Sequence, residues 1–446
     1  MIQLPEAFVE RTKTLLADEF SAFEKALNET VPVCVRVNDK IVDLSPSDTK
    51  VKWCDDGFYF DERPIFTADP LLHAGAYYVQ EASSMFLNQV VDVYMQNVNY
   101  VLDLCAAPGG KSTLLSQYLP KDSLLVSNEF VRSRAMILAE NMTKWGNPNI
   151  VVTNNSPKDF ERLHGFFDAV IVDAPCSGEG MFRKVPDAIS EWSVQNVQQC
   201  VIRQKSIIED VWDSLRNEGV FVYSTCTYNK EENEDNVEWI CKTLGAEVLP
   251  IDISKFDGII QTEFGYRFFP HKVKGEGFFI SVMRKISENT VSEIKIKNNK
   301  KDNKLIDRHK EFSNQINNAD DFEIKELNQK IIAFPKKYYF ECLYLEKHFN
   351  CILNGVEIAE IKGKDIIPSH QLALSKIINI DAFDTVELNY EAAIAFLRKE
   401  SININDEIPR GYILVTYQHL PLGWIKNLGN RANNLYPQHW RIRMSF

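Results

Sequence analysis

The sequence predicts an α/β protein whose largest part is an open, mostly parallel β-sheet with helices on both faces. Three observations lead to this prediction. Between about residues 99 and 285, short apolar runs typical of buried strands alternate with longer segments of helical period. Polar, turn-forming motifs directly follow several of these strands, at the edge where such sheets bind ligands. The composition is that of a globular protein, with 45% hydrophobic and 25% charged residues among 446.

Strands and helices follow one another in the order that βαβ units require. The expected strands are Val101–Leu104, Leu124–Asn128, Phe167–Val172, Gly219–Ser224 and Gly277–Met283. The expected helices are Gly110–Tyr118, Val131–Trp145, about Val194–Leu215 and one that begins near Glu231. Upstream, an amphipathic pattern from Phe8 to Phe23 predicts one or two helices, and alternation in Val31–Val37 predicts a strand.

These patterns divide the chain into five segments. Residues 286–320 are rich in Lys, Asn and Asp and have no sustained apolar period, so we expect a polar linker there. We interpret its Lys-rich stretch, 295–310, as solvated linker rather than a binding arm. The segments are a small N-terminal α/β domain (1–95), the large sheet (96–285), the linker (286–320), a small intermediate domain (321–370) and a C-terminal mixed α/β region (371–446).

Cysteine usage and the N-terminus narrow the class of protein. None of the nine cysteines forms a CxxC pair, which argues against a disulfide scaffold or a zinc ribbon, so we expect no metal. Residues Met1–Glu6 have neither a basic head nor an apolar signal core, and no apolar run approaches the roughly 18 residues of a membrane span. We therefore expect a cytoplasmic protein with reduced thiols and no membrane partner.

Charge is distributed unevenly along the chain. The 50 Lys and Arg against 62 Asp and Glu give a net charge of −12, which by itself weighs against nucleic-acid binding. Residues 409–446, however, contain five basic side chains and no acidic one, so the rest of the chain carries −17. The basic residues of this tail are Arg410, Lys426, Arg431, Arg441 and Arg443.

The motif Asp103–Lys111, DLCAAPGGK, lies between the first expected strand and its helix. Glycines at such a turn let the backbone approach a ligand, and the amides of the helix end face a negative group. A P-loop is excluded because it needs glycine where Cys105 stands, and no GxGxxG is present. The motif indicates a small, carboxylate-bearing, nucleotide-like ligand, with a tight turn lacking any ligand as the simpler alternative.

Glu129 follows the second expected strand, where an acidic side chain can accept hydrogen bonds from ribose hydroxyls. A solvated or helix-capping glutamate is the alternative. Two cysteines also follow strands, in Asp173–Gly178 (DAPCSG) and Ser224–Thr227 (STCT). A free cysteine is usually a small buried hydrophobe, but polar, turn-forming neighbours surround Cys176 and Cys226. Both are therefore candidate nucleophiles.

Together, DLCAAPGGK (103–111), DAPCSGEG (173–180) and STCTY (224–228) resemble the Nop/Sun family of RNA (cytosine-5)-methyltransferases. Leu4–Phe8 and Tyr78–Ser84 resemble its bacterial ribosomal-RNA branch, which is RsmF-like. Gly423–Lys426 and Asn434–Pro437 resemble the PUA-like RNA-binding end of that branch. The resemblance covers most of the chain and is weakest between about 286 and 370.

The resemblance implies a Rossmann-like S-adenosylmethionine-dependent methyltransferase domain between a substrate-binding N-terminal domain and a PUA-like C-terminal domain. Glu129 would hold the adenosine ribose, and Asn155 stands where the family usually has an aspartate. The implied cofactor-binding residues are Cys105, Ala106, Ala107, Pro108, Gly109, Gly110, Lys111, Glu129, Arg134, Asn155 and Asp173. No metal is implied.

The same resemblance implies covalent catalysis, because C5 of cytosine is too weakly nucleophilic to take a sulfonium methyl group directly. Addition of the Cys226 thiolate to C6 activates C5, and Cys176 assists release of the methylated product. Asp173 would stabilise the protonated N3 side of the base. The cytosine must leave its stack, which favours structured RNA with a splayed or loop nucleotide.

We expect a monomer that acts on small-subunit (16S) ribosomal RNA, free or in the assembling 30S subunit, with transfer RNA as the second choice. A DNA cytosine-5 methyltransferase would instead use Pro175-Cys176 as its nucleophile motif, and an amino-group methyltransferase would show [DN]PP[YF] where DAPC stands. A non-catalytic ribosome assembly factor would be expected to lack Cys226 or the glycines, and both are present. Trp424 and Tyr436 fit either base stacking or core packing.

Overall fold

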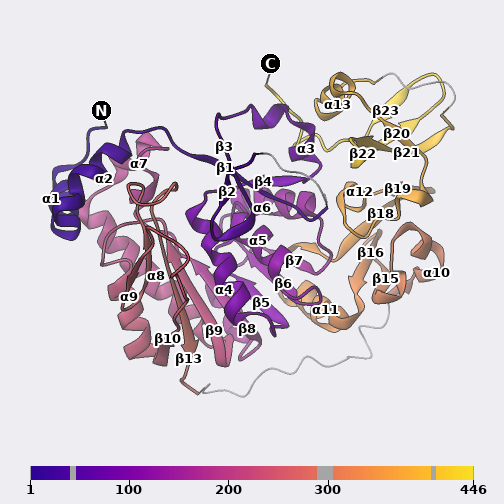
Figure 1. Ribbon diagram of the computed structural model, residues 1–446. Helices are drawn as coiled ribbons and strands as arrows, with labels where there is room; N and C mark the ends of the chain where they lie inside the picture. Colours follow the sequence, from indigo (N-terminus) through magenta and orange to yellow (C-terminus); the bar gives the residue numbers. More distant parts are fainter. Residues whose placement is uncertain (1, 41–46, 289–304, 403–407, 445–446) are drawn as a thin grey trace.

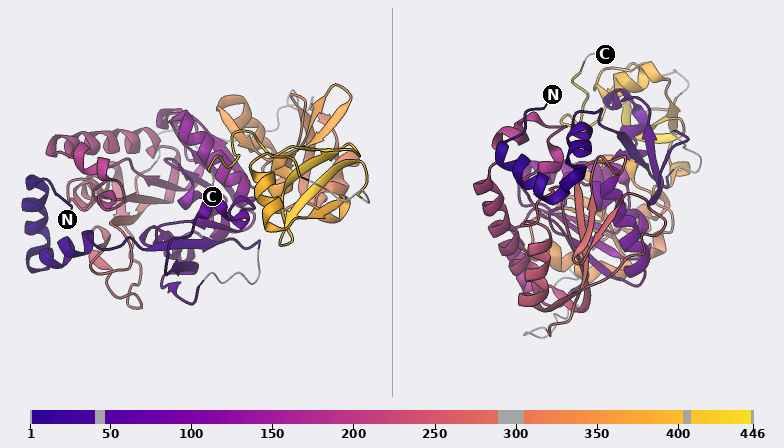
Figure 2. Two further views of the ribbon diagram at one scale, coloured as in Figure 1. Left: turned by 90° about the horizontal axis from the view of Figure 1, so that it is seen from above. Right: turned by 60° about the vertical axis from the view of Figure 1, so that its left-hand side comes forward.

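The structure is a computed structural model that describes residues 2–40, 47–288, 305–402 and 408–444. It is elongated, with the N-terminal helices at one end and the C-terminal sheets at the other (Figures 1 and 2). A ten-stranded sheet fills the centre, in the order β11-β12-β13-β9-β8-β5-β6-β7-β17, with β10 beside β13. Among the described residues, no helix is long and apolar enough to cross a membrane.

The central sheet is parallel in its middle and antiparallel at both edges. β5 pairs in parallel with β6 and β8, β6 with β7, and β8 with β9. Its strands are β5 (Tyr100–Asp103), β6 (Leu124–Asn128), β7 (Ile150–Thr153), β8 (Phe167–Asp173), β9 (Leu215–Thr225), β10 (Ala246–Val248), β11 (Ile260–Thr262), β12 (Gly265–Phe268), β13 (Phe278–Lys285) and β17 (Cys351–Asn354). The associated helices are α4 (Leu87–Tyr94), α5 (Gly110–Tyr118), α6 (Arg132–Trp145), α7 (Pro186–Glu191), α8 (Val194–Trp212) and α9 (Glu234–Trp239).

Apolar side chains cover both faces of this sheet, which explains why its strands are recognisable in the sequence. Val101 and Ile171 are buried on one face, and Leu102 and Val170 on the other. The predicted α/β fold with a mostly parallel sheet is confirmed. The expected helix near Glu231 begins instead at Glu234, because residues 230–233 form a turn.

The N-terminal segment contributes two helices and a four-stranded antiparallel sheet. Phe8 and Phe23 anchor the helices in an aromatic cluster with Tyr228, which lies beyond β9. The helices are α1 (Glu6–Leu16), α2 (Phe20–Leu27) and, as a single turn, α3 (Pro70–His73), and the strands are β1 (Val33–Val37), β2 (Lys50–Val51), β3 (Cys54–Phe60) and β4 (Tyr77–Val79). This segment therefore packs against the loops that follow the central strands.

The C-terminal region holds two further sheets. The five-stranded sheet has the order β14-β15-β16-β18-β19, and the four-stranded sheet β20-β21-β22-β23. The strands are β14 (Ile306–Asp307), β15 (Phe322–Leu327), β16 (Lys330–Pro335), β18 (Val356–Lys362), β19 (Asp365–Pro368), β20 (Thr385–Glu387), β21 (Gly411–Tyr417), β22 (Leu420–Asn427) and β23 (Ala432–Asn434). The helices are α10 (His309–Phe312), α11 (Tyr339–His348), α12 (His370–Leu374) and α13 (Tyr390–Leu397).

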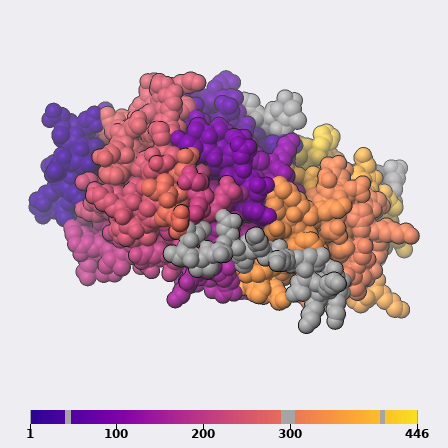
Figure 3. All heavy atoms as spheres, turned by 90° about the horizontal axis from the view of Figure 1, so that it is seen from below, coloured from indigo at the N-terminus to yellow at the C-terminus, as the bar shows by residue number. Residues whose placement is uncertain are grey.

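The predicted boundaries at 286–320 and 321–370 need correction. Residues 305–320 are part of the C-terminal core, because Phe312 and Ile316 are buried there despite their polar surroundings. Residues 321–370 are not a separate intermediate domain, since β17 pairs with β7 and extends the central sheet. From below, the orange C-terminal residues lie directly against the purple ones of the centre (Figure 3). Most of the stretch 295–310 lies outside the described residues.

Of the two roles that the sequence allows for Trp424 and Tyr436, the structure supports core packing. Trp424 is 1% exposed and Tyr436 is fully buried. Trp424 donates from Nε1 to the Ser369 carbonyl (2.8 Å) and packs edge-on against Phe383. Both rings therefore form the core of the C-terminal region, and neither presents a face to a nucleotide.

Candidate active site

The candidate site lies where the order of the parallel strands reverses. The chain moves from β5 outward through β6 and β7, and then returns to the other side of β5 with β8 and β9. In open α/β sheets the loops that leave such a switch point diverge and form a crevice at the carboxyl ends of the strands. The motif-bearing loops after β5, β6, β8 and β9 all open into this crevice.

One cavity, of about 700 Å³, is lined by five of the eleven predicted cofactor-binding residues, and most of the others line a second cavity beside it. Glu129 lies in its wall, 4% exposed, and its Oε1 accepts a hydrogen bond from the Val131 backbone N–H (2.8 Å). Its Oε2 lies 3.5 Å from Arg134 Nη1. The predicted residues in the wall are Cys105, Ala107, Glu129, Arg134 and Asp173, and further wall residues include Phe130, Val131, Pro157 and Ile207.

The loop after β5 is shaped by its glycines and by α6. Gly109 has φ +120°, a conformation that side chains other than glycine rarely adopt, and α5 begins at the next residue. Arg134 Nη2 donates to the Ala107 carbonyl (2.8 Å), and Asn141 Nδ2 donates to the Pro108 carbonyl (2.8 Å). Arg134 therefore supports the loop in addition to lining the cavity.

The side chain of Asn155 forms hydrogen bonds within the protein. Its Nδ2 donates to Asp159 Oδ2 (3.1 Å), and its Oδ1 accepts from the Asn350 backbone N–H (2.9 Å). The cavity wall at this point is formed by Ser156 and Pro157 instead. The amide of Asn155 is thus used within the protein, at the contact between the loop after β7 and the segment that leads into β17.

A second cavity, of about 420 Å³, adjoins the first. The two share Cys105, Ala107, Asp173 and Cys226. The N-terminal domain forms one wall of the second cavity, and other walls come from the loop after β8 and the start of β13. The further wall residues include Tyr78, Gln80, Glu81, Ser84, Met181, Lys184, Glu276 and Phe278. Lys184 and Glu276 were not predicted from the sequence, because no recognisable motif surrounds them.

Asp173 and Lys111 meet between the cavities. Lys111 Nζ lies 2.7 Å from Asp173 Oδ2, and the Ser224 hydroxyl donates to Asp173 Oδ1 (2.7 Å). Burial alone would lower the pKa of Lys111, but the Asp173 carboxylate raises it above its ordinary value. The first turn of α5 and the end of β9 thus hold Asp173 in one orientation.

The environment of Asp103 shows whether a cationic ligand would fit at the second cavity. Its side chain is fully buried at the second cavity, Oδ2 accepts from Ser112 Oγ (2.6 Å), and Oδ1 has no hydrogen-bond partner among the described residues. Burial raises the pKa of Asp103 to about 7. A cationic amino group near Asp103 and a ribose near Glu129 would satisfy both carboxylates, so these residues fit S-adenosylmethionine.

The two predicted catalytic cysteines are brought together. Cys176 Sγ lies 3.3 Å from Cys226 Sγ, and Cys226 lines both cavities. The hydrogen bond with Cys226 and burial raise the pKa of the Cys176 thiol well above its ordinary range. Gly180 packs on this loop, because its N–H donates to the Cys226 carbonyl (2.8 Å) and a Cβ there would lie 2.7 Å from the same oxygen.

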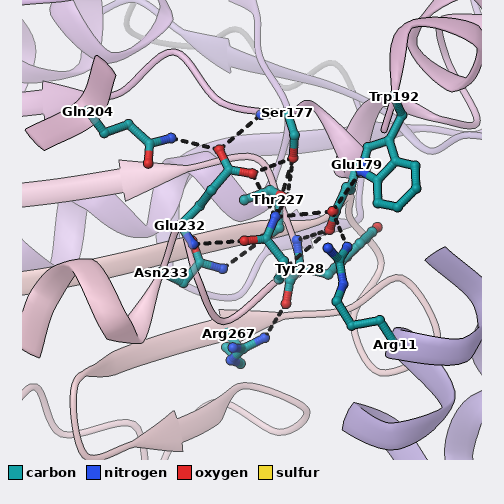
Figure 4. Close-up of polar contacts among 11 residues, drawn as sticks. Arg11, Ser177, Glu179, Trp192, Gln204, Thr227, Tyr228, Glu232, Asn233 and Arg267 are labelled. Atoms are coloured by element: carbon teal, nitrogen blue, oxygen red, sulfur yellow. Dashed lines mark hydrogen bonds and ion pairs between the residues drawn. The ribbon is translucent and has the colours of Figure 1, made fainter. Parts of the chain in front are cut away.

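A buried polar network behind the cysteines was not predicted (Figure 4). It joins the loop after β8 to the loop after β9 through two carboxylates, Glu179 and Glu232. Glu179 also accepts hydrogen bonds from Arg11 of α1 and from Trp192 Nε1 (3.0 Å). In the sequence, Glu232 belongs to the acidic run after Cys226, which resembles a solvated helix start.

Comparison with known proteins identifies the family of this chain. Family models match residues 4–82 (N-terminal domain of 16S rRNA methyltransferase RsmF), 91–284 (16S rRNA methyltransferase RsmB/F) and 383–442 (methyltransferase RsmF PUA domain). Ribosomal RNA small subunit methyltransferase F of Vibrio cholerae is 30% identical, over 98% of this chain and 97% of that protein. The protein of the same name from Escherichia coli O157:H7 is 32% identical, over 87% and 84%.

A solved structure shows the same architecture. A methyltransferase homologue from Pyrococcus horikoshii superposes with a TM-score of 0.55 at 26% identity, covering 64% of this chain and 96% of that one. The sequence resemblance, the Rossmann-like fold and the C-terminal PUA assignment are therefore confirmed. This chain belongs to the 16S rRNA methyltransferase RsmB/F family of S-adenosylmethionine-dependent RNA methyltransferases, and it carries the RsmF N-terminal and PUA domains.

Proposed function

We propose that the protein methylates C5 of a cytosine in small-subunit ribosomal RNA through a transient covalent bond between Cys226 and C6 of the base. The observation that carries this proposal is the position of Cys226. Its side chain lines both cavities, which between them hold the carboxylates that fit the cofactor, and its sulfur lies 3.3 Å from that of Cys176. A nucleophile at such a junction can bond to a base in one cavity while C5 faces the other.

S-adenosylmethionine would extend from the larger cavity, with Glu129 at its ribose, to Asp103 at the wall of the smaller one. When bound, this cofactor supplies the methyl group that C5 receives. Glu129→Ala is expected to weaken its binding about 10- to 100-fold, because a charged hydrogen-bond acceptor is removed. RNA affinity should stay unchanged in that variant, and titration calorimetry with each ligand measures both.

The rest of the smaller cavity, beside Cys226, would receive the target base after it leaves its stack, which costs a few kcal/mol. The Cys226 thiolate adds to C6, and electron density moves to C5. Asp173, held by Lys111 and Ser224, meets the N3 side of the ring. After methylation water takes the C5 proton, the S–C6 bond breaks with its electron pair returning to the Cys226 sulfur, and Cys176 assists this release.

Small-subunit ribosomal RNA is the proposed substrate because the relatives are named for it. The test is methyl transfer from labelled S-adenosylmethionine to ribosomal RNA, transfer RNA or duplex DNA, followed by nucleoside analysis. We expect 5-methylcytidine in 16S rRNA or the small subunit. Labelling of transfer RNA alone would favour the alternative substrate, and labelling of DNA would move the nucleophile to Cys176.

We further propose that the protein acts as a monomer in the cytoplasm. Both cavities are lined by residues of one chain, so a single copy carries the whole site. Activity that is proportional to protein concentration, together with a sedimentation mass near 51.3 kDa, is expected. A dimer mass under assay conditions would contradict the monomer.

A further inference from the structure

Cys226 is held from both sides by one residue that precedes α9. Thr225 Oγ1 donates a hydrogen bond to Asn233 Oδ1 (2.6 Å), and Asn233 Nδ2 donates one to the Thr227 carbonyl (3.0 Å). Thr225 and Thr227 are the chain neighbours of Cys226. Asn233 is fully buried, so these bonds form away from water and fix the backbone that carries the Cys226 sulfur.

Glu232, the residue before Asn233, holds Cys176 in the same way. The backbone N–H of Ser177 donates to Glu232 Oε2 (3.0 Å), and the Ser177 hydroxyl donates to Oε1. Gln204 Nε2 donates both to Glu232 Oε2 (2.7 Å) and to the Pro175 carbonyl (3.1 Å). Pro175 and Ser177 are the chain neighbours of Cys176. Two adjacent residues, 232 and 233, thus each fix one cysteine.

Glu232 differs from two other buried carboxylates of these loops, Glu179 and Glu234. Glu179 pairs with Arg11, and Glu234 pairs with Arg267. Within the described part of the chain, Glu232 is fully buried and forms no ion pair. Its partners in Figure 4 include Ser177 and Gln204, both uncharged. A buried carboxylate without a counter-ion is unfavourable even when it is well hydrogen-bonded. A function for its charge would explain its presence.

That charge acts on Cys176. The Glu232 carboxylate is among the causes that raise the pKa of the Cys176 thiol, after the bond to Cys226 and burial. Burial raises the pKa of Glu232 itself, while the hydrogen bonds that Ser177, Asn229 and Gln204 donate oppose this shift. Cys176 therefore keeps its proton within hydrogen-bond reach of the sulfur that must leave the base.

We propose that Glu232 is a positioning residue for Cys176, which it fixes beside Cys226 as a thiol, and that Asn233 is the corresponding positioning residue for Cys226. This inference rests on the proposed function. In product release, the S–C6 bond breaks and its electron pair returns to the Cys226 sulfur, which takes the proton of the Cys176 thiol. The C5 proton passes to water, and water returns a proton to Cys176.

The test is the amount of covalent protein–RNA adduct after denaturation, with full-length protein, S-adenosylmethionine and unmodified 16S rRNA. Glu232→Gln should accumulate adduct as Cys176→Ala does, at least about 5-fold above wild type, with an unchanged KM for RNA and a kcat lowered by about 10- to 100-fold. Asn233→Ala should form adduct slowly and accumulate none. Glu234→Gln is the matched control, because Glu234 lies two residues further along and pairs with Arg267. This variant should accumulate no more adduct than wild type.

Absence of adduct in Glu232→Gln, when Cys176→Ala accumulates it, would overturn the inference and leave the proposed function intact. Absence of adduct in Cys176→Ala as well would overturn the proposed function. Should Glu232→Gln fail to fold, Ser177→Ala removes one bond to Glu232 and keeps the charge. It is expected to accumulate adduct to an intermediate level, and a wild-type level in this variant would equally contradict the proposal.

Discussion

The catalytic crevice and the C-terminal region use their buried residues in opposite ways. Around the two cysteines, buried carboxylates accept hydrogen bonds from two loops and fix them, as Glu232 does with Ser177. In the C-terminal region, Trp424 and Tyr436 are buried as packing, and His370 lies against Tyr436 with neither ring nitrogen hydrogen-bonded among the described residues. The resemblance in the polar motifs thus identified residues that line the crevice, whereas the resemblance around Trp424 and Tyr436 identified residues of the C-terminal core.

The largest effect is expected in the crevice. Cys226→Ala should lower methyl transfer by about 1,000-fold or more, because the proposed nucleophile that adds to C6 is removed. Its melting temperature should stay within a few degrees of wild type, since only one partly exposed sulfur is removed. A rate assay with a thermal melt checks both, and residual transfer near the wild-type rate would shift the nucleophile to Cys176.

A substitution in the C-terminal core should instead lower stability strongly and leave cofactor binding unchanged. Trp424→Ala is expected to lower the free energy of unfolding by about 3–5 kcal/mol, as for other buried aromatic residues, and to leave S-adenosylmethionine affinity unchanged. Denaturant unfolding measures the first and calorimetry the second. A stable variant with weakened RNA binding would instead restore base stacking as the role of this ring.

The stability of the C-terminal region, and of its contact with α3, should depend on pH. Burial lowers the pKa of His370 to about 3 and that of His73, which lies 3.4 Å from the Tyr436 hydroxyl, to about 4. In the unfolded chain both titrate near pH 6.5. Between about pH 6.5 and 4 the unfolded state therefore binds more protons, so stability falls as the pH falls. His370→Gln should flatten the decline of the melting temperature over this range, and an unchanged decline would exclude His370 as its cause.

The smallest effect is expected from the surface of the C-terminal region. Arg431, Arg441 and Arg443 are exposed, and no acidic residue interrupts residues 409–446. Replacing all three by alanine should weaken RNA binding and reduce the slope of log affinity against log salt by about one unit for each phosphate that is no longer neutralised. Cofactor affinity is the internal control. An unchanged salt slope would place RNA docking elsewhere.

The sequence predicts the parts of this fold that are locally marked. The boundaries of α5 and β6 are confirmed because glycines and continuous apolar runs delimit them. β17 was missed because its residues are only partly apolar, and it becomes a strand through pairing with β7, which lies far earlier in the chain. Its place in the sheet depends on a non-local contact that no window of sequence contains.

In the candidate site, too, residues in local motifs could be predicted and residues placed by non-local packing could not. Cys176, Cys226, Asp173 and Glu129 stand in motifs at strand ends, so their convergence on one crevice could be predicted. Glu232 could not, because an acidic residue near a helix start is normally solvated and only the packed loops bury it. Asn155 was assigned by its position in the family pattern alone, and no motif in the sequence indicates its contacts with Asp159 and Asn350.

The most direct test of covalent catalysis is to identify the cysteine that bonds to RNA. Cys176→Ala protein would be incubated with S-adenosylmethionine and 16S rRNA, then digested with trypsin and nuclease for mass spectrometry. We predict a nucleotide mass on the peptide of residues 217–230, which contains Cys226, and its disappearance in the double variant with Cys226→Ala. A nucleotide on any other cysteine, or methyl transfer that persists in the double variant, would contradict covalent catalysis by Cys226.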